Sequence, residues 1–209
     1  MPRAALTRER VLEAGIRLAD AGGVESITMR KLGRALGVEA MSLYNHVANK
    51  DDLLDGIVDI VLDEFELPEA GSDWETAVRR TASSAHEALV RHPWACSLVM
   101  SRARPSRMRY IDALLRCLRE AGFSPEETFD AYHAIDSHIL GFTMWELGHS
   151  FDPAEVDELV KTYMAQVAVE YPDLYEHAQQ HFDDSRPRGQ SGFEFGLDLI
   201  LDGLKRRHG

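Results

Sequence analysis

The sequence has few cysteines and no long apolar run. Cys96 and Cys117 are the only two thiols in 209 residues, too few for a disulfide framework or a zinc cluster, so both are expected to be reduced. No stretch of about 18 apolar residues is available to span a membrane. The opening Met1-Pro2-Arg3 lacks the apolar core of a secretory signal. We therefore expect a cytoplasmic protein that makes no membrane contact.

Strand patterns are missing too. No Val/Ile/Thr-rich alternation bounded by hairpin turns occurs, whereas apolar residues recur at helical spacing almost throughout. The fold class is therefore expected to be all-α. Helices are predicted over residues 7–21, 29–36, 40–47, 50–66, 73–91, 94–101, 105–121, 125–149, 154–182 with a break at Pro172, and 190–207. Residues 183–190 are expected to form a mobile loop.

Positive charge is scarce except at the N-terminus. The net charge is −12, yet residues 1–50 carry 8 Lys/Arg against 5 Asp/Glu, a net +3, which leaves −15 for the remainder. A basic head on an acidic body is typical of a DNA-binding module joined to a domain with another task. We expect a DNA-binding domain over 1–50, a connecting helix over 51–66, and a ligand-binding and dimerisation domain over 67–209.

The strongest motif lies between Thr28 and Lys50. Thr28 can cap a short helix, and Gly37 can supply the left-handed turn that ends it. A second short helix follows, as in a helix-turn-helix, where the second helix enters the major groove. Leu32, Leu36, Val38 and Leu43 are expected to be buried. The polar and small residues that remain are the predicted DNA contacts: Thr28, Arg30, Ala40, Met41, Ser42, Tyr44, Asn45, His46 and Lys50.

The chemistry of these side chains suits both base and phosphate contacts. Arg30 can bond guanine through two hydrogen bonds, and Asn45 can pair with adenine or a phosphate. Ala40 and Met41 can touch a thymine methyl group. Phosphates are the expected partners of Ser42, Tyr44 and Lys50.

This segment resembles the DNA-binding head of the TetR (tetracycline-repressor) family. The family signature has a Thr opening the second helix, a Gly-Val turn, Leu-Tyr-x-His, and a Lys starting the fourth helix. They stand here at Thr28, Gly37-Val38, Leu43-Tyr44-Asn45-His46 and Lys50, within a match over about residues 7–66. The resemblance implies a repressor that binds near-palindromic operator DNA as a homodimer and leaves it on binding a small-molecule effector.

Downstream, the sequence resembles the effector-binding body of the subgroup that includes the tetracycline repressor itself. This implies a dimer formed by a four-helix bundle of the helix at 125–149 and the last helix. Apolar residues on these helices are numerous enough for both a core and a partner. The alternative is that both helices belong to a monomeric bundle. The predicted interface residues are Phe129, Tyr132, Ile139, Phe193, Leu197, Ile200 and Leu204.

The expected effector pocket differs from that of the tetracycline-binding members. Ala82, His86, Met100 and Arg116 stand where those have a drug-anchoring asparagine and phenylalanine, a metal-binding histidine and a drug-contacting glutamine, so magnesium-tetracycline is not the expected effector. The mixture of residues suits an amphipathic ligand. The predicted pocket residues are His86, Met100, Arg104, Met108, His133, Ser137, His138, Phe142 and Trp145. The short helix at 94–101 is expected to transmit binding to the helix at 50–66.

Two rival interpretations remain. The spacings His177/His181 and Asp130/His133 could serve a metal-dependent enzyme, but the first pair lacks the glutamate of an HExxH motif. We therefore expect no enzymatic activity, no metal and no cofactor. The other interpretation is a helix-turn-helix protein controlled by a protein partner, which an exposed apolar patch without a ligand-sized cavity would favour.

Overall fold

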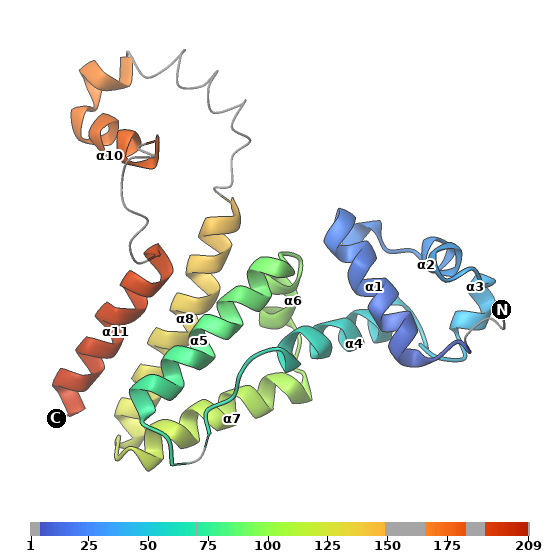
Figure 1. Ribbon diagram of the computed structural model, residues 1–209, viewed down its shortest axis with the longest axis horizontal. Helices are drawn as coiled ribbons and strands as arrows, with labels where there is room; N and C mark the ends of the chain where they lie inside the picture. The colour runs from blue at the N-terminus through green and yellow to red at the C-terminus, as the bar shows by residue number, and fades with distance from the viewer. Residues whose placement is uncertain (1–4, 70, 149–165, 183–190, 209) are drawn as a thin grey trace.

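The computed structural model describes residues 5–69, 71–148, 166–182 and 191–208, with the backbone alone described over 178–182. In chain order its elements are α1 (Arg8–Gly22), the 3-10 helix η1 (Val24–Ser26), α2 (Met29–Leu36), α3 (Ala40–Leu43), α4 (Lys50–Asp63), α5 (Trp74–Arg91), α6 (Ala95–Ser101), α7 (Pro105–Glu120), α8 (Pro125–Gly148), α10 (Pro172–Phe182) and α11 (Gly192–His208) (Figure 1). No strand occurs within these ranges. The all-α prediction is confirmed.

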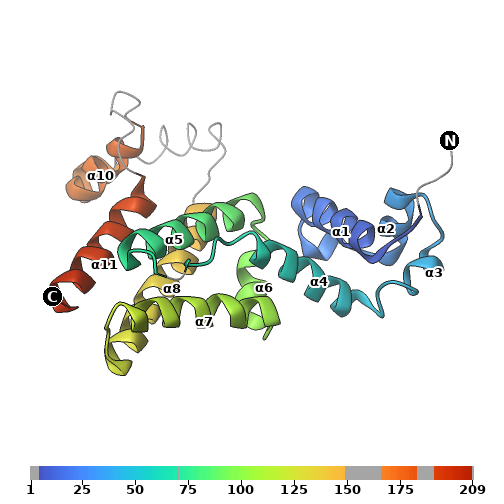
Figure 2. The same ribbon diagram turned by 60° about the horizontal axis from the view of Figure 1, so that its bottom comes forward.

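The head consists of α1, α2 and α3 with the first half of α4, which runs on into the body (Figures 1 and 2). Val11, Leu32, Leu43 and Ile57 are fully buried where these helices meet. At Gly56, α1 and α4 approach so closely that a Cβ would lie 2.6 Å from Leu12 Cδ2. The head is therefore a small core that continues through α4.

Three side chains cap the helices of the head, and Thr28 is one of them, as predicted. The Thr7 hydroxyl accepts from Arg10 N at 3.3 Å, and the Thr28 hydroxyl accepts from Lys31 N at 3.2 Å. The Asn49 side chain accepts from Asp52 N at 2.9 Å. Each cap satisfies a backbone donor that has no partner inside its helix, so the helix starts are fixed locally.

Two helices of the head end earlier than expected. The helix predicted over 40–47 ends at Leu43 and continues as a turn, in which His46 N and Val47 N both donate to Leu43 O. The chain leaves the helix because Asn49 needs an extended backbone, with φ −164° and ψ −174°, to cap α4. The helix predicted over 50–66 ends at Asp63, and Glu66 N donates to the Ser84 hydroxyl of α5 at 2.8 Å.

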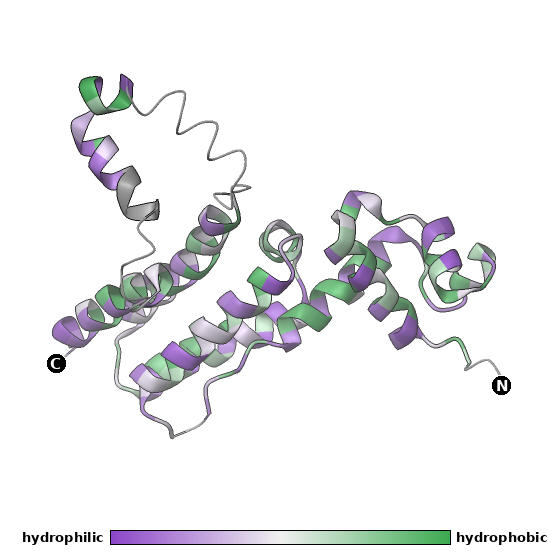
Figure 3. Cartoon of the chain, turned by 45° about the horizontal axis from the view of Figure 1, so that its top comes forward, coloured by the Kyte–Doolittle hydropathy of each residue, from purple (hydrophilic) through white to green (hydrophobic). Residues whose placement is uncertain are grey.

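The body is a set of amphipathic helices around α8, which packs against α5, α7 and α11. Figure 3 shows that most helices carry both hydrophobic and hydrophilic residues along their length. α5, α6, α7, α8 and α11 begin and end within two residues of the predicted bounds. Ser124 and Glu127 form a capping box at the start of α8, with Ser124 N to Glu127 Oε2 at 2.8 Å.

The remaining predictions fall partly outside the described residues. Of the helix predicted over 154–182, residues 154–165 lie outside, 166–170 are helical, and α10 begins at Pro172 after the non-helical Tyr171. The break at Pro172 is thus confirmed, while the loop expected over 183–190 lies outside. Within the described part, none of the helices combines the length and the apolar character that crossing a membrane requires.

Candidate DNA-binding and effector sites

The predicted DNA contacts gather on α2, α3 and the turn after α3, at the end of the molecule away from the body (Figure 1). Met41 is 75% exposed and Tyr44 is 45% exposed, although large side chains of this kind are usually buried. The exposed members are Thr28, Arg30, Met41, Tyr44 and Asn45, and the half-buried members are Ala40, Ser42, His46 and Lys50. This surface therefore offers both charged and apolar groups to a groove.

Two glycines set the spacing of the helix-turn-helix. A Cβ at Gly33 would lie 2.8 Å from Val38 O and 3.3 Å from Ala40 N, so the backbones of α2 and α3 are in direct contact. Gly37 adopts the left-handed conformation, with φ 67°, which glycine reaches without steric cost. The close packing holds α3 in a fixed position relative to α2.

Arg8 braces the turn that follows α3, a role that the sequence analysis missed. Its Nη1 donates to His46 O at 2.7 Å, and its guanidinium pairs with Asp52 on α4. The hydrogen bond from Arg8, assisted by one from Ala48 N, lowers the pKa of Asp52 to about 2. The two residues are 44 positions apart, and no local pattern links them.

Four aromatic rings of the body meet where α5, α8 and α11 face one another. The His86 ring is stacked on Phe193, with centroids 4.0 Å apart and planes 5° apart. His138 is also stacked on Phe193, with centroids 4.8 Å apart, and its centroid lies 5.6 Å from that of Phe142. Trp145 lies 5.7 Å from Phe142. We call His86, His138, Phe142 and Phe193 the aromatic cluster.

Hydrogen bonds orient both histidines of the aromatic cluster. Thr143 donates its hydroxyl proton to Ile139 O at 2.6 Å, so it accepts from His86 Nδ1 at 2.8 Å. The other ring nitrogen of His86 lies 3.3 Å from Glu146 Oε2. Burial lowers the pKa of His86, against the opposing charge of Glu146. His138 Nε2 donates to Phe193 O at 2.8 Å, because a carbonyl oxygen can only accept.

Five of the predicted pocket residues lie away from the aromatic cluster. Met100 and Met108 are 62% and 59% exposed, on α6 and α7. His133 and Ser137 are exposed on an outward face of α8, and His133 Nδ1 donates to Phe129 O at 2.7 Å. Arg104 faces α4, where it pairs with Asp55 and Asp59. The structure thus brings together only His86, His138, Phe142 and Trp145 of the predicted set, because helical spacing alone does not tell which face of α8 looks inward.

The predicted dimer residues divide between core and surface. Ile139, Phe193 and Leu197 are at most 2% exposed, so they serve the core of a single chain and leave almost no surface for a partner. Tyr132, Ile200 and Leu204 are half-buried. Phe129 is 62% exposed, and Phe195 and Leu199 on α11 are 58% and 57% exposed. Turning Phe193, Leu197 and Leu201 inward places the opposite side of α11 in solvent.

An ion-pair ladder, not foreseen from the sequence, joins α4 to the body. Its carboxylates are spaced four residues apart on α4, and its arginines come from the α6–α7 segment. Arg102 donates to Asp51 at 3.1 Å and also pairs with Asp55. Arg104 donates to Asp55 at 2.9 Å and pairs with Asp59, and Arg109 donates to Asp63 at 2.6 Å. α6 also packs directly on α4.

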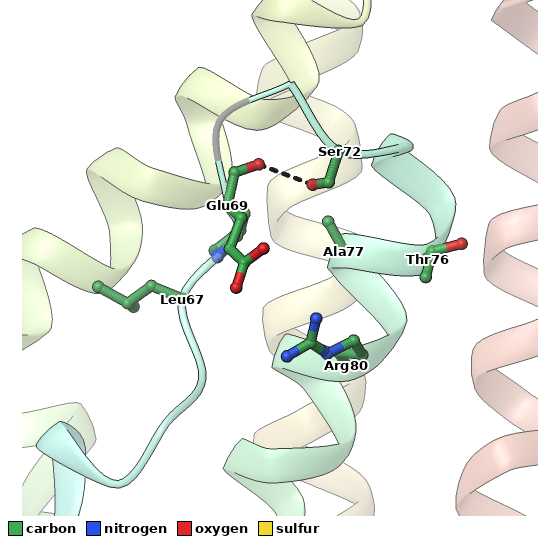
Figure 4. A pocket seen from close by; sticks show the side chains of 7 residues that line it. Leu67, Glu69, Ser72, Thr76, Ala77 and Arg80 are labelled. Carbon is green, nitrogen blue, oxygen red and sulfur yellow. Dashed lines mark hydrogen bonds between the residues drawn. The ribbon is translucent and has the colours of Figure 1, made fainter.

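The described residues also include two cysteines and one small cavity. Cys96 and Cys117 are free and buried, which raises the pKa of both thiols. Among the described residues no group of three His, Cys, Asp or Glu could hold a metal, and the side chain of His181 lies outside them. A cavity of about 30 Å³ lies between α5 and the segment before it, and Figure 4 shows the side chains that line it. It has room for a water molecule and not for an organic ligand.

The sequence matches known families over nearly its whole length. Residues 11–57 match "Bacterial regulatory proteins, tetR family", and residues 67–208 match "Tetracyclin repressor-like, C-terminal domain". An HTH-type transcriptional regulator of Saccharopolyspora erythraea is 30% identical, over 95% of this chain and 84% of that protein. The tetracycline repressor protein class D of Escherichia coli is also 30% identical, over 97% of this chain and 90% of that protein.

A solved structure shares the same fold. The TetR family protein ActR of Streptomyces coelicolor, in complex with actinorhodin, has a TM-score of 0.73 and 25% identity, over 99% of this chain and all of that chain. Members of this family bind operator DNA and small-molecule effectors. The chain belongs to the TetR family of bacterial regulatory proteins: it is a ligand-responsive transcriptional repressor with a helix-turn-helix head, and it is not an enzyme.

Proposed function

We propose that the chain acts as a homodimer that represses transcription from a near-palindromic operator and is released by an amphipathic small molecule bound beside the aromatic cluster. Two features together carry the proposal. The predicted DNA contacts on α2, α3 and the turn after α3 form an exposed, chemically mixed surface, which we call the reading surface, and ion pairs tie α4 to the body. A DNA-binding regulator of this kind works in the cytoplasm. The head, the connecting helix and the body would form separate functional parts, with α4 contributing to both cores.

The reading surface supports specific contacts with both bases and phosphates. Arg30 and Asn45 are exposed and carry the donor groups that recognise purine edges. Met41 is exposed at the start of α3 and suits a thymine methyl group. Lys50 stands at the first turn of α4, where a phosphate would meet both its charge and the positive end of the helix dipole. The other predicted DNA contacts would position the head on the backbone.

An exposed apolar face on α8 and α11 supports the homodimer. Phe129 and Met144 on α8 and Phe195 and Leu199 on α11 are all between 47% and 62% exposed. Large apolar side chains gathered on two neighbouring helices mark an interaction surface. Joining two copies through this face would present two heads to half-sites about one helical turn, or 34 Å, apart.

The aromatic cluster supports a ring-containing effector. Phe142 is half-buried and the neighbouring Trp145 is 48% exposed, so these two rings offer apolar surface, and the carboxylate of Glu146 beside His86 offers a polar anchor. The relative ActR was solved with actinorhodin, and the class D relative is named a tetracycline repressor. Magnesium-tetracycline remains an unfavourable ligand here, because Ala82 is fully buried and Arg116 is exposed beside Asp112. The effector is therefore a different amphipathic ring compound.

The coupling route supports release by a ligand in the body. α6 packs on α4, and the ion-pair ladder fixes α4 to α6 and α7. A ligand that moves α6 would therefore tilt α4 and change the separation of the two heads. An effector weakens DNA binding only as far as it binds the dimer with displaced heads more tightly than the DNA-binding form. A coupling free energy of about 1–3 kcal/mol corresponds to a loss of operator affinity of about 5- to 150-fold.

Fluorescence anisotropy with DNA from upstream of the protein's own gene tests the proposal. We expect saturable binding by one dimer, loss of binding in Arg30→Ala, and release by one or more polycyclic aromatic compounds but not by magnesium-tetracycline. Sedimentation of the free protein should give a dimer. A monomeric protein, or one that binds no DNA from this region, contradicts the proposal. Release by a cell extract fraction that is protease-sensitive would show that a protein partner replaces the small molecule.

A further inference from the structure

A buried polar cluster joins α7 to α8. Its centre is the carboxylate of Asp136 on α8, which forms an ion pair with Arg107 on α7, and these two side chains are 13% and 11% exposed. The carboxylate also accepts from the hydroxyls of two tyrosines, Tyr110 on α7 and Tyr132 on α8, each at 3.3 Å. We call Asp136, Arg107, Tyr110 and Tyr132 the Asp136 cluster. Two of these contacts with the carboxylate cross from α7 to α8, and the third lies within α8.

The Asp136 cluster fixes the orientation of the Tyr110 ring. Burying an ion pair costs free energy, and well-packed apolar side chains of similar volume would often stabilise a core equally well. Hydrogen bonds have a preferred direction, which apolar contacts lack. Tyr110 is 1% exposed, its hydroxyl is bound to Asp136, and the guanidinium carbon of Arg107 lies 4.9 Å from the centroid of its ring. The ring is therefore held at its hydroxyl and over one face.

Tyr110 also contacts the chain at the end of α4. The rings of Tyr110 and Phe65 pack edge to face, with centroids 5.5 Å apart and planes at 78°, an arrangement that aromatic pairs prefer. Phe65 is 4% exposed, and its backbone N donates to Leu62 O in the last turn of α4 at 3.2 Å. A displacement of the Tyr110 ring would therefore move the end of α4 as well.

α8 is the helix to which the Asp136 cluster ties the end of α4. This helix carries Phe129 and Met144 of the exposed apolar face that we assign to the dimer. A fixed position relative to α8 is therefore also a fixed position relative to the partner. The ion-pair ladder joins α4 to the α6–α7 segment, so the contact between Tyr110 and Phe65 adds a separate link from α4 through α7 to α8.

We propose that Tyr110 is a positioning residue for operator binding: with the Asp136 cluster it fixes the end of α4 relative to the dimer face, and thereby sets the half-site spacing that the dimer accepts. This inference rests on the homodimer proposed above. α4 has 14 residues and is about 21 Å long, and it carries the head at its other end (Figure 2). A small shift where α4 meets the body is therefore enlarged at α2 and α3. Heads that are held firmly lose less conformational freedom on binding and tolerate less change in spacing.

The test compares two operators that differ only in spacing. Dissociation constants are measured at constant pH and salt for the operator located by footprinting upstream of the protein's own gene, and for the same DNA with one base pair inserted at its centre. The ratio of the two constants reports how strictly the heads are spaced, and a folded variant that is only less stable leaves it unchanged. Tyr110→Phe keeps the ring and loses the hydrogen bond to Asp136. We expect this variant to lower the ratio about fivefold, at the lower end of measured coupling between sites.

Tyr132→Phe is the matched control. It removes a hydroxyl that donates to the same carboxylate at the same distance of 3.3 Å, but this bond joins two residues of α8 and so cannot fix α8 relative to α4. We therefore expect Tyr132→Phe to keep the original ratio. Phe65→Leu keeps an apolar side chain and removes the contact between the rings, so it should lower the ratio as Tyr110→Phe does.

Folding and assembly are checked for each protein. Circular dichroism and urea denaturation confirm that a variant is folded under the assay conditions, and if either Tyr110→Phe or Phe65→Leu fails to fold, the other decides. An unchanged ratio in a folded Tyr110→Phe or Phe65→Leu, or an equal fall in Tyr132→Phe, overturns the positioning role. Absent operator binding, or a monomer, in the unaltered protein overturns the proposed function instead.

Discussion

Arg8 of α1 and Asp52 of α4 form a two-point ion pair, with Arg8 Nη2 2.7 Å from Asp52 Oδ1 and Nη1 3.1 Å from Oδ2. The same guanidinium donates to His46 O, and Asp52 also accepts from Ala48 N at 2.8 Å. One pair of side chains therefore closes the turn between α3 and α4. Paired, charge-assisted hydrogen bonds of this geometry are among the stronger polar contacts in proteins.

Removing this pair should destabilise the head more at pH 7 than at pH 2.5, where Asp52 is partly protonated. Arg8 holds the pKa of Asp52 at about 2, below its ordinary 3.8, so the stabilisation is present above pH 3.8 and is lost as the pH falls through 2. Allowing for solvent screening, we expect Arg8→Met to lower the unfolding free energy by about 1 kcal/mol at pH 7. Urea denaturation at pH 7 and pH 2.5 checks this. Arg17→Met, which affects an exposed pair with Glu13, is the control, and an equal loss at both pH values would contradict the assignment.

Arg30 and Lys50 should affect operator binding in different ways. Arg30→Ala is expected to weaken binding by about 1–3 kcal/mol and to relax the preference at one base pair per half-site. Lys50→Ala should weaken all sequences similarly and reduce the salt dependence, because a phosphate contact releases counterions. Affinities for a set of operator mutants at two salt concentrations distinguish them. If both variants behaved alike across the set, the division into base and phosphate contacts would be incorrect.

The exposed side of α11 should control dimerisation, and its buried side should control stability. Leu199→Glu is expected to dissociate the dimer, because Leu199 is 57% exposed and a charge there would be buried against a partner. Leu197→Ala, at a fully buried position, should lower the unfolding free energy by about 2–5 kcal/mol and leave a dimer. Sedimentation and urea denaturation of both variants give the answer. Dimers of Leu199→Glu at micromolar concentration would place the interface elsewhere.

The ion-pair ladder should be most sensitive at Arg104. Its side chain and that of Asp59 are 23% and 24% exposed, and Asp59 Oδ1 is buried without a hydrogen bond. Arg104→Met should therefore destabilise the protein by about 1–3 kcal/mol. Adding Asp59→Asn should recover part of the loss, which a double-mutant cycle measures. Arg109→Met, in a pair whose side chains are 62% and 54% exposed, should stay within about 0.5 kcal/mol.

Effector binding and its transmission should be separable. Trp145→Ala is expected to lower affinity for the effector found by the anisotropy screen while leaving operator binding of the free protein near normal, which gives a permanently repressing variant. Leu98→Ala, on the α6 helix that packs on α4, should keep effector binding and reduce the release of DNA. Operator affinity with and without effector is measured for each. Loss of DNA binding in Trp145→Ala would show that this side chain belongs to the core.

Local signals were enough to predict where the helices of the head begin and which of its side chains are exposed. Thr28, Gly37 and Asn49 each act on neighbouring backbone, by capping a helix or by adopting a positive φ, so their effect could be inferred without knowing the fold. The exposure of Arg30 and Met41 could be inferred as well, because Leu32 and Leu43 supply the buried side of the same helices. The basic charge of this segment and its family signature led to the same function. The sequence by itself therefore determined a helix-turn-helix repressor.

The partners of the long-range polar contacts, in contrast, were decided only by the tertiary structure. Arg8 contacts Asp52, 44 positions away in the sequence, and His92 contacts Asp20, 72 positions away. Helical periodicity relates only residues within one helix, so it cannot predict such pairs. Arg104, expected to contact the effector, faces the carboxylates of α4 instead. The inward face of α11 was also undetermined, since its apolar residues lie on two sides and both sides have helical spacing. Packing against α5 and α8 selected Phe193 and Leu197 for the core, because a helix with two apolar sides buries whichever one its neighbours cover.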